Sequence, residues 1–252
     1  ASASTSAHQP AAAMVTAGAA VPARSGAGSA VGSAAGTMWR GAPDWRRAAA
    51  TRPYDTLSVR RYANLPTVGA IEMQDLLERA SRLRLVVFDV DGVLTDGSLY
   101  LGDDGQEYKA FNSRDGHGMA MLRDSGVTLA VITGRRSEVV RIRMQSLGIE
   151  HVHQGCRDKL PTFLALTQQL GIAHEACAYM GDDLMDLPVM RRVGLAAAVA
   201  DAHPVVREHA DWCAPSAGGR GAARDLCELI LRAQGKLDAL VAAYLGTTGA
   251  AR

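Results

Sequence analysis

The feature that most constrains this chain is an apolar run that ends in two carboxylates two residues apart. Residues 86–88 read Val-Val-Phe, and Asp89, Asp91 and Gly92 follow at once. A continuous apolar run predicts a strand buried on both faces, as in parallel sheets. Acids at the C-terminal end of such a strand lie where open α/β sheets carry their active sites, and NH groups freed by a glycine can surround an anion. The run therefore predicts an α/β fold with a charged site at one sheet edge.

Other strands are expected to end in the same way. An apolar run at 129–132 is followed by Thr133 and Gly134, and another at 176–181 is followed by Asp182 and Asp183. Several acids at one place are costly unless a cation or a reaction uses them. The pattern indicates a site assembled from several strand ends.

Strand and helix patterns alternate from residue 83 onward, which favours a doubly wound parallel sheet with helices on both faces. The predicted strands are 84–90, 128–133, 151–154, 176–181 and 195–199. The predicted helices are 116–125, 137–147, 159–170, 184–192, 203–209 and 221–234. The glycines expected to end four of these helices are Gly126, Gly148, Gly171 and Gly194. Asp201 is expected to cap the helix at 203–209.

One insertion interrupts this alternation. Two short strand patterns at 98–101 and 107–111 flank the turn Gly102-Asp103-Asp104-Gly105, which predicts a β-hairpin. No cap domain of substantial length follows it. The expected fold is therefore a Rossmann-like sheet without a cap, carrying a small hairpin flap.

The first part of the chain differs in composition from the rest. Residues 1–72 hold seven arginines, no lysine and three acids, a net charge of +4, so that the remainder carries −3 of the overall +1. Residues 1–50, rich in Ala, Ser and Gly, resemble a transit peptide, but an upstream extension before a start at Met73 is the favoured interpretation. We expect 1–72 to be disordered, 73–245 to form the folded domain and 246–252 to be a disordered tail. Neither charge suggests nucleic-acid binding by the folded part.

The cysteines give no sign of a disulfide framework or a zinc site. Cys156, Cys177, Cys213 and Cys227 form no CxxC pair, and no apolar run reaches the length that spans a bilayer. A reducing cytoplasm is the expected location, without membrane contact.

The DxD, Thr, Lys and GDD motifs, met in this order, resemble those of the haloacid dehalogenase superfamily. The segments DVDGVLTDGSLYLGDDGQEYKAFNSRDGHG, ITGRRS, GDDLMDLPVM, VADAHPVV and GGRGAARDLCELIL further resemble the 3-deoxy-D-manno-octulosonate 8-phosphate phosphatases, over about residues 83–240. The resemblance implies a Mg²⁺-dependent hydrolase of that sugar-acid phosphate, which serves lipopolysaccharide synthesis in Gram-negative bacteria. It also implies a homotetramer in which the hairpin and the C-terminal tail meet neighbouring subunits.

The resemblance assigns a role to each carboxylate. Asp89 is the expected nucleophile, because a carboxylate can attack phosphorus and form an acyl phosphate. Asp91 is the expected general acid and base. Mg²⁺, which prefers hard oxygen ligands, would be held by Asp89, Asp182 and the backbone carbonyl of Asp91. Asp183 would reach the metal through water or orient Asp182.

The transferring phosphoryl group requires cationic and hydroxyl partners. Thr133 and Lys159 are expected to hold it, together with the backbone NH groups of Asp91, Gly92 and Gly134. Asp186 either supports Lys159 or is a solvated acid in the first turn of a helix.

The sugar acid requires a partner for its own carboxylate, and guanidinium groups bind carboxylates bidentately. Arg114 is one candidate. Gly116 and Gly118 would let the substrate approach the chain closely, and His117 between them faces either the pocket or solvent. Arg220 is another candidate. By the resemblance it reaches the site of a neighbouring subunit, and the alternative is that it lies in a flexible loop before the last helix.

Three other functions remain open at this point. The chain could hydrolyse another sugar-acid phosphate, such as a nonulosonate 9-phosphate. A receiver-like module also accepts phosphate on an aspartate without turnover, but it needs no acid/base such as Asp91. The chain could also be a catalytically silent assembly module, but such a module would not need all five motif residues, Asp89, Asp91, Thr133, Lys159 and Asp182.

Overall fold

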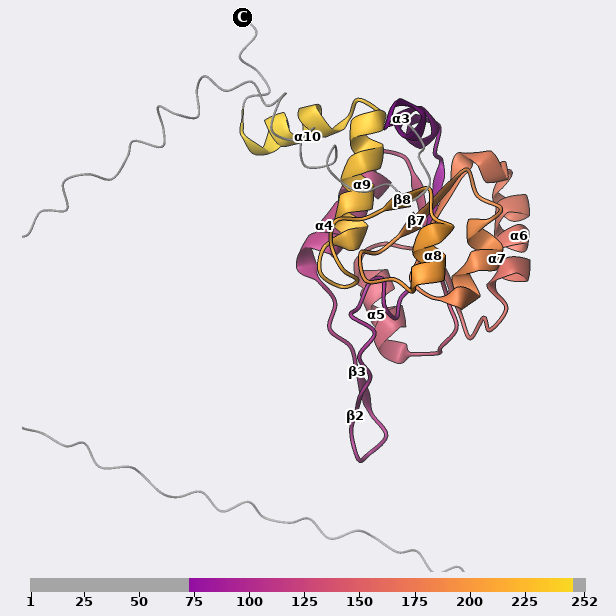
Figure 1. The fold of residues 1–252 in the computed structure, drawn as a ribbon. Coiled ribbons are helices and arrows are strands. Elements are labelled where there is room, and N and C mark those ends of the chain that lie inside the picture. Colours follow the sequence, from indigo (N-terminus) through magenta and orange to yellow (C-terminus); the bar gives the residue numbers. More distant parts are fainter. Residues whose placement is uncertain (1–72, 247–252) are drawn as a thin grey trace, which may run out of the picture. The chain divides into compact units, whose positions relative to one another are not determined.

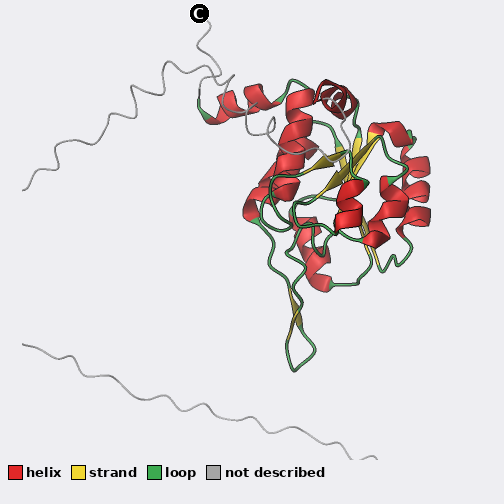
Figure 2. Ribbon diagram, in the orientation of Figure 1, coloured by secondary structure: helices red, strands yellow, loops and turns green. Residues whose placement is uncertain are grey.

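The computed structural model describes residues 73–246, so the predicted extension at 1–72 and nearly all of the predicted tail lie outside the described residues. Within them, six parallel strands form one sheet in the order β5-β4-β1-β6-β7-β8 (Figure 2). The strands are β1 (Leu85–Phe88), β4 (Thr128–Thr133), β5 (His151–Gln154), β6 (Cys177–Gly181), β7 (Leu195–Ala198) and β8 (Trp212–Cys213).

The central strand β1 explains why its sequence is apolar without alternation. It pairs in parallel with β4 on one side, where Phe88 lies opposite Val131, and with β6 on the other, where Phe88 lies opposite Met180. All four residues of β1 are fully buried, because helices cover both faces of the sheet.

Helices pack on both faces of the sheet, as Figure 1 shows. Those on the face of α4 are α3 (Met73–Ser81), α4 (Ser113–Asp124), α5 (Glu138–Ser146) and α9 (Ala222–Ala233). Those on the opposite face are α6 (Lys159–Leu170) and α7 (Leu187–Met190). The remaining elements are the short helices η1 (His174–Ala176) and η2 (Leu184–Asp186), α8 (Pro204–Glu208) and α10 (Leu237–Tyr244).

The strand order reverses beside β1. The chain passes from β1 to β4 and β5 in one direction and then crosses back to β6 on the other side of β1. Helices on opposite faces diverge at such a reversal, which leaves a crevice at the carboxyl ends of the two strands. Asp89 and Asp182 follow β1 and β6, so the topology brings both to that crevice.

The five predicted strands are confirmed: β4 and β5 have the predicted bounds, and β1, β6 and β7 differ from theirs by one or two residues at an end. The short strand β8 and the helix α10 were not predicted. The helix expected at 116–125 begins at Ser113 instead, because the side chain of Asn112 accepts the backbone N–H of Arg114 at 2.9 Å and caps it.

Three of the four helix-ending glycines have the expected conformation. Gly126, Gly148 and Gly171 have φ values of 92°, 65° and 61°. The prediction for Gly194 is wrong, since α7 already ends at Met190, with Arg191 as its C-cap. A Cβ on Gly194 would lie 1.9 Å from a backbone oxygen of η1, so this glycine permits two chain segments to approach closely.

The predicted cap at Asp201 is also wrong. His203 is the N-cap of α8, and its Nδ1 accepts the backbone N–H of Val205 at 3.2 Å. The Asp201 carboxylate instead accepts the backbone N–H of Gly218 at 2.9 Å. Asp201 therefore holds the loop that precedes α9 rather than the helix that follows it.

The predicted hairpin is present as β2 (Tyr100–Leu101) and β3 (Glu107–Tyr108), which pair antiparallel. It extends away from the sheet in Figure 1, and Leu101 and Tyr108 on it are exposed. Among residues 73–246, no helix combines the length and the apolar character that crossing a bilayer requires.

Candidate active site

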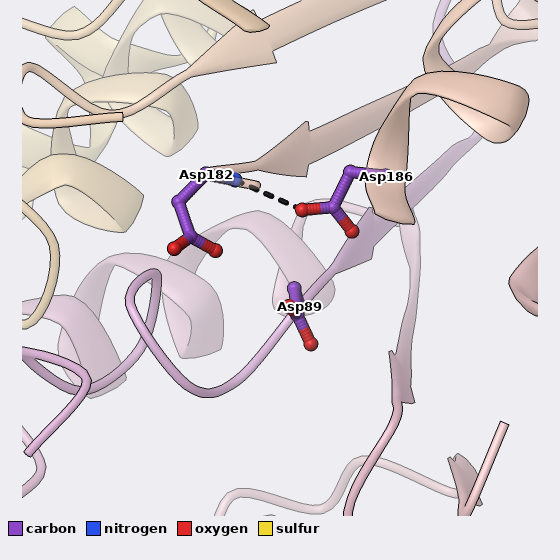
Figure 3. A group of neighbouring side chains, drawn as sticks. All are labelled: Asp89, Asp182 and Asp186. Carbon is purple, nitrogen blue, oxygen red and sulfur yellow. Dashed lines mark hydrogen bonds between the residues drawn. The ribbon is translucent and has the colours of Figure 1, made fainter. Parts of the chain in front are cut away.

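Three carboxylates meet at the carboxyl ends of β1 and β6. Asp89, Asp182 and Asp186 each place one oxygen within 4.8 Å of the others. Figure 3 shows Asp89 directly after its strand, with Asp182 and Asp186 beside it. We call these three residues the carboxylate cluster.

Asp186 forms the support of the cluster and is fully buried. One of its oxygens accepts the backbone N–H groups of Asp182 at 3.0 Å and Asp183 at 3.1 Å. The other accepts the Tyr179 hydroxyl at 2.6 Å and the Lys159 ammonium at 2.6 Å. Of the two interpretations of Asp186, support of Lys159 is therefore confirmed.

The chain makes room for this support at the end of β6. A Cβ on Gly181 would lie 2.5 Å from the side chain of Asp186, so only a glycine lets this carboxylate fold back over the strand end. The backbone oxygen of Asp182 also accepts the N–H of His203 at 2.8 Å, which fixes the chain where it leaves the sheet.

Lys159 bridges two members of the cluster. Its Nζ lies 2.8 Å from Asp89 and 2.6 Å from Asp186, and its side chain is fully buried. The residue stands at the start of α6, whose N-cap Asp158 accepts the backbone N–H of Leu160 at 3.2 Å. Burial would lower the pKa of Lys159, but the two carboxylates raise it above its ordinary value and keep the ammonium charged.

Asp89 and Asp182 carry charge that no protein group neutralises fully. Burial first, and then repulsion from Asp186, raises the pKa of Asp89 to about 6 despite the attraction of Lys159. Burial and the neighbouring acids Asp89 and Asp186 raise the pKa of Asp182 to about 8. One oxygen of Asp89 and one of Asp182 are buried without a hydrogen-bond partner. Unpaired carboxylate oxygens so placed fit a hard divalent cation.

The turn after β1 is shaped to approach Asp182. Gly92 has φ 92°, and a Cβ there would lie 2.1 Å from the Asp182 carboxylate. The N–H groups of Val93, Leu94 and Thr95 all converge on the oxygen of Val90. This tight turn brings the segment that carries Asp91 and Gly92 against the carboxylate cluster.

Thr133 lies at the end of β4, adjacent to β1, and is buried. Gly134 follows it, and the backbone oxygen of Thr133 accepts the N–H of Cys156 at 3.0 Å. The structure thus places the motif residues Asp89, Thr133, Lys159 and Asp182 at one edge of the sheet.

Asp91 is not a member of the carboxylate cluster and has partners of its own. Its carboxylate is paired with the ammonium group of Lys109, which follows β3, and lies 3.9 Å from the Arg135 guanidinium. Arg135 comes from the loop after β4 and also contacts Glu107 of the hairpin at 3.2 Å. Asp91 is therefore held by the hairpin and by the adjacent loop.

The structure does not bring the two candidate arginines to the carboxylate cluster. Arg114 is exposed in the first turn of α4, and Arg220 is 68% exposed and pairs with Asp96 at 3.0 Å. His117 is exposed and makes an edge-to-face contact with Tyr244 at 5.5 Å. A residue in this position faces away from the buried site.

Gly116 and Gly118 make room for the chain itself rather than for a ligand. A Cβ on Gly116 would lie 2.2 Å from the guanidinium of Arg143, and one on Gly118 would lie 2.6 Å from the side chain of Arg224. Both glycines are buried where α4 meets its neighbouring helices. The expectation that they admit substrate is therefore not supported.

The loop before α9 packs directly on the turn after β1. The N–H of Gly219 donates to the oxygen of Val93 at 2.9 Å. A Cβ on Gly218 would lie 1.7 Å from the backbone oxygen of Gly92. The C-terminal GGRG motif therefore supports the segment that carries Asp91 and Gly92 within the same chain.

Gly218→Ala is expected to destabilise the protein and displace the turn after β1. The added Cβ would overlap the backbone oxygen of Gly92, and a backbone atom cannot move aside as the end of a flexible side chain can. We expect a loss of about 2–4 kcal/mol in the free energy of unfolding. Urea denaturation measures it. Gly126→Ala is the control, since Gly126 has φ 92° but nothing within 4 Å of an added Cβ, so its cost is conformational, about 1–2 kcal/mol. A smaller loss at Gly218 than at Gly126 would contradict this contact.

Sequence reasoning did not identify three side chains that the structure brings to the site. Tyr179 lies in a strand whose residues are all buried, so no alternation distinguishes it. Glu107 and Lys109 lie in a segment that was predicted only as half of a hairpin. A signal was available, because Glu107 and Lys109 are two residues apart in a strand pattern and so share one face of it.

Comparison with known proteins agrees with this geometry. A family model described as haloacid dehalogenase-like hydrolase matches residues 152–226. The 3-deoxy-D-manno-octulosonate 8-phosphate phosphatase of Escherichia coli K12 is 49% identical over 176 residues, which are 70% of this chain and 94% of that protein.

Solved structures give the same result. A probable phosphatase from Pseudomonas syringae is 55% identical, with a TM-score of 0.67 over 68% of this chain and 98% of that one. The 3-deoxy-D-manno-octulosonate 8-phosphate phosphatase of Moraxella catarrhalis, solved with magnesium, phosphate and the sugar acid, is 42% identical. Its TM-score is 0.68 over 69% of this chain and 99% of that one.

Proposed function

The chain belongs to the 3-deoxy-D-manno-octulosonate 8-phosphate phosphatases within the haloacid dehalogenase-like hydrolases, and we propose that it hydrolyses that ester with Mg²⁺ as its cofactor. The products are the free sugar acid and phosphate, and the reaction serves lipopolysaccharide synthesis. The observation that carries the proposal is the carboxylate cluster. In it, one oxygen of Asp89 is paired with Lys159, while the other oxygen of Asp89 and one oxygen of Asp182 are buried without a hydrogen-bond partner at the crevice of the sheet.

In the first half of the reaction, a carboxylate oxygen of Asp89 attacks phosphorus. The bond between phosphorus and the sugar oxygen breaks, and the carboxyl group of Asp91 gives its proton to that oxygen. An aspartyl phosphate on Asp89 and the free sugar acid result. Lys159 and Thr133 stabilise charge on the phosphoryl oxygens, with the backbone NH groups of Asp91, Gly92 and Gly134 around them.

In the second half, Asp91 takes a proton from a water molecule that attacks phosphorus. The bond between phosphorus and Asp89 breaks, and phosphate leaves. Asp89, Asp182 and the backbone carbonyl of Asp91 would hold the cation, which when bound lowers the repulsion between an anionic nucleophile and an anionic phosphate.

Recognition of the sugar acid and assembly are part of the same proposal. Arg114 and Arg220 bind the substrate carboxylate, and Arg220 does so from a neighbouring subunit of a homotetramer. The exposed hairpin, with Leu101 and Tyr108 facing outward, supports contact with another copy. The enzyme works in the cytoplasm on a small-molecule substrate, without nucleic acid or membrane.

A substrate panel tests the proposal. Phosphate release would be measured with Mg²⁺ for 3-deoxy-D-manno-octulosonate 8-phosphate, a nonulosonate 9-phosphate, hexose 6-phosphates and p-nitrophenyl phosphate. We expect kcat/KM to be highest for the octulosonate ester. A higher value for the nonulosonate ester would replace the substrate and keep the chemistry, whereas no turnover of any ester would favour a phospho-acceptor or an assembly module.

Metal binding is expected to depend on pH in a defined direction. Because the pKa of Asp182 is raised to about 8, folding without metal is favoured at low pH and loses stability as pH rises toward 8. Mg²⁺ requires the carboxylate, so its affinity falls by up to about tenfold for each pH unit below 8. The melting temperature should therefore rise more on addition of Mg²⁺ at pH 8 than at pH 6.

Thermal unfolding with and without Mg²⁺ at both pH values measures this effect. Asp182→Asn should remove most of the Mg²⁺-dependent increase, while Asp103→Asn in the exposed hairpin turn should retain it. An equal increase at pH 6 and pH 8 in the unaltered protein would show that protonation of Asp182 does not oppose metal binding, and an undiminished increase in Asp182→Asn would show that Asp182 is not a ligand.

A further inference from the structure

The side chain of Lys109, in the segment that follows β3, turns inward. Its side chain is 1% exposed, whereas the preceding Tyr108 is 59% exposed. The hairpin otherwise extends from the body of the molecule in Figure 1. A lysine ammonium group is rarely enclosed in this way unless it is paired, so its partners show what the arrangement achieves.

The partners of Lys109 form a compact group of alternating charges. Its ammonium group pairs with Asp91 and lies 3.3 Å from Glu107. The guanidinium of Arg135 lies 3.2 Å from Glu107 and 3.9 Å from Asp91. Two cations and two carboxylates thus connect the turn after β1, the hairpin and the loop after β4. Burial raises the pKa of Glu107, but hydrogen bonding from Ser137 and the charges of Lys109 and Arg135 outweigh it. The pKa of Glu107 is therefore lowered below its ordinary value.

This arrangement leaves Asp91 little freedom. Its carboxylate is held from one side by Lys109 and approached on the other oxygen by Arg135. The Asp89 carboxylate, in contrast, is paired with Lys159, and the backbone N–H of Asp182 is held by Asp186. The nucleophile and the acid/base are therefore positioned by different parts of the chain, and only the acid/base depends on the hairpin.

We propose that Lys109 is a positioning residue that orients the Asp91 carboxyl group for proton exchange, so that placement of the hairpin controls this step. The inference rests on the proposed phosphatase function. In the step concerned, the bond between phosphorus and the sugar oxygen breaks, its electron pair stays on that oxygen, and the proton of Asp91 passes to it. In the next step a proton passes from the attacking water to Asp91, which restores the acid.

The leaving group separates this role from a merely structural one. A sugar alkoxide is a poor leaving group and needs a proton, whereas p-nitrophenolate leaves without one. Hydrolysis of the aspartyl phosphate is common to both esters, whereas kcat/KM reports only the steps up to release of the alcohol. Loss of Lys109 should therefore lower kcat/KM for the sugar ester and leave kcat/KM for p-nitrophenyl phosphate nearly unchanged. A residue that only anchors the hairpin or binds phosphate would affect both esters alike.

The experiment compares Lys109→Met with the unaltered full chain on both esters. We expect kcat/KM for the sugar ester to fall about 10- to 100-fold, with kcat/KM for p-nitrophenyl phosphate changed by less than about 3-fold. Lys109→Arg should restore most of the loss, because it keeps the charge. In an Asp91→Asn background, Lys109→Met should add little, because the group that it positions is already absent.

Lys236→Met is the matched control, since the Lys236 ammonium also makes two hydrogen bonds, to Ser125 and Gln234, but far from Asp91 in the chain. It should leave both rates unchanged. Glu107→Gln removes a partner of Lys109 and leaves Asp91 itself unaltered. We expect it to lower kcat/KM by a smaller factor, again for the sugar ester more than for p-nitrophenyl phosphate. This second variant keeps the test valid if Lys109→Met fails to fold.

Equal losses on the two esters, or full additivity with Asp91→Asn, would overturn the inference. If the unaltered protein prefers another sugar phosphate of the panel, the substrate proposal fails, and the same comparison made with that ester still judges Lys109. Absence of turnover with every ester would overturn both.

Discussion

Asp89→Asn is expected to lower phosphate release from the sugar-acid ester by about 10⁴-fold or more, because an amide oxygen cannot form the acyl phosphate. The fold should persist, since Asp89 is a buried acid whose raised pKa of about 6 shows that its charge is not favoured there. Steady-state release of phosphate with saturating Mg²⁺, together with thermal unfolding, measures both effects.

Asp103→Asn is the matched control for that change. Asp103 lies in the exposed turn of the hairpin, so the same substitution there should leave kcat within about twofold, as for surface positions generally. An Asp89→Asn protein that retains more than a tenth of the activity would exclude Asp89 as the nucleophile.

Asp186→Ala is expected to lower the free energy of unfolding by about 3–5 kcal/mol, the range found when one partner of a buried ion pair is removed. Four donors lose their acceptor at once, namely the Lys159 ammonium, the Tyr179 hydroxyl and two backbone N–H groups. Because the site is closed, we expect no water molecule to take the place of the lost acceptor. Urea denaturation in the absence of Mg²⁺ measures the loss.

Asp183→Ala provides the comparison from the same turn. Its side chain is exposed and caps η2, where it accepts the N–H of Leu184 at 2.8 Å, so a loss of about 1 kcal/mol is expected for a cap residue. Similar losses for the two variants would show that Asp186 is not the support of the cluster.

Much of the fold follows from apolar runs whose length suits a strand. β1, β4 and β6 were predicted because they are buried on both faces and end in polar residues. β8 was not, because two residues at the sheet edge give no periodic signal. The helix expected at 184–192 is divided between η2 and α7, since Asp186 turns inward to the cluster.

The site was predictable as a set of residues but not as an arrangement. The sequence places Asp182 and Asp183 side by side, and nothing local distinguishes a cluster member from an exposed cap. The tertiary packing of the turn after β1 on the Asp182 carboxylate decides it, because a Cβ on Gly92 would lie 2.1 Å from that carboxylate. The inward turn of Lys109 depends in the same way on how the hairpin leaves the sheet.

The C-terminal motif illustrates the same limit. Truncation before Gly218 is not a useful test of Arg220, because it would remove α9, whose buried residues include Leu226 and Ile230. Arg220→Ala is the better substitution, since this side chain is exposed and pairs with Asp96 on the surface.

The most direct test of the account is rapid acid quenching during turnover of 3-deoxy-D-manno-octulosonate 8-phosphate with Mg²⁺, followed by mass spectrometry of the peptide that contains Asp89. We predict a phosphoryl group on Asp89 that appears within the first turnover and disappears when substrate is exhausted. A phosphoryl group on another residue, or phosphate release with none on Asp89, would contradict the account.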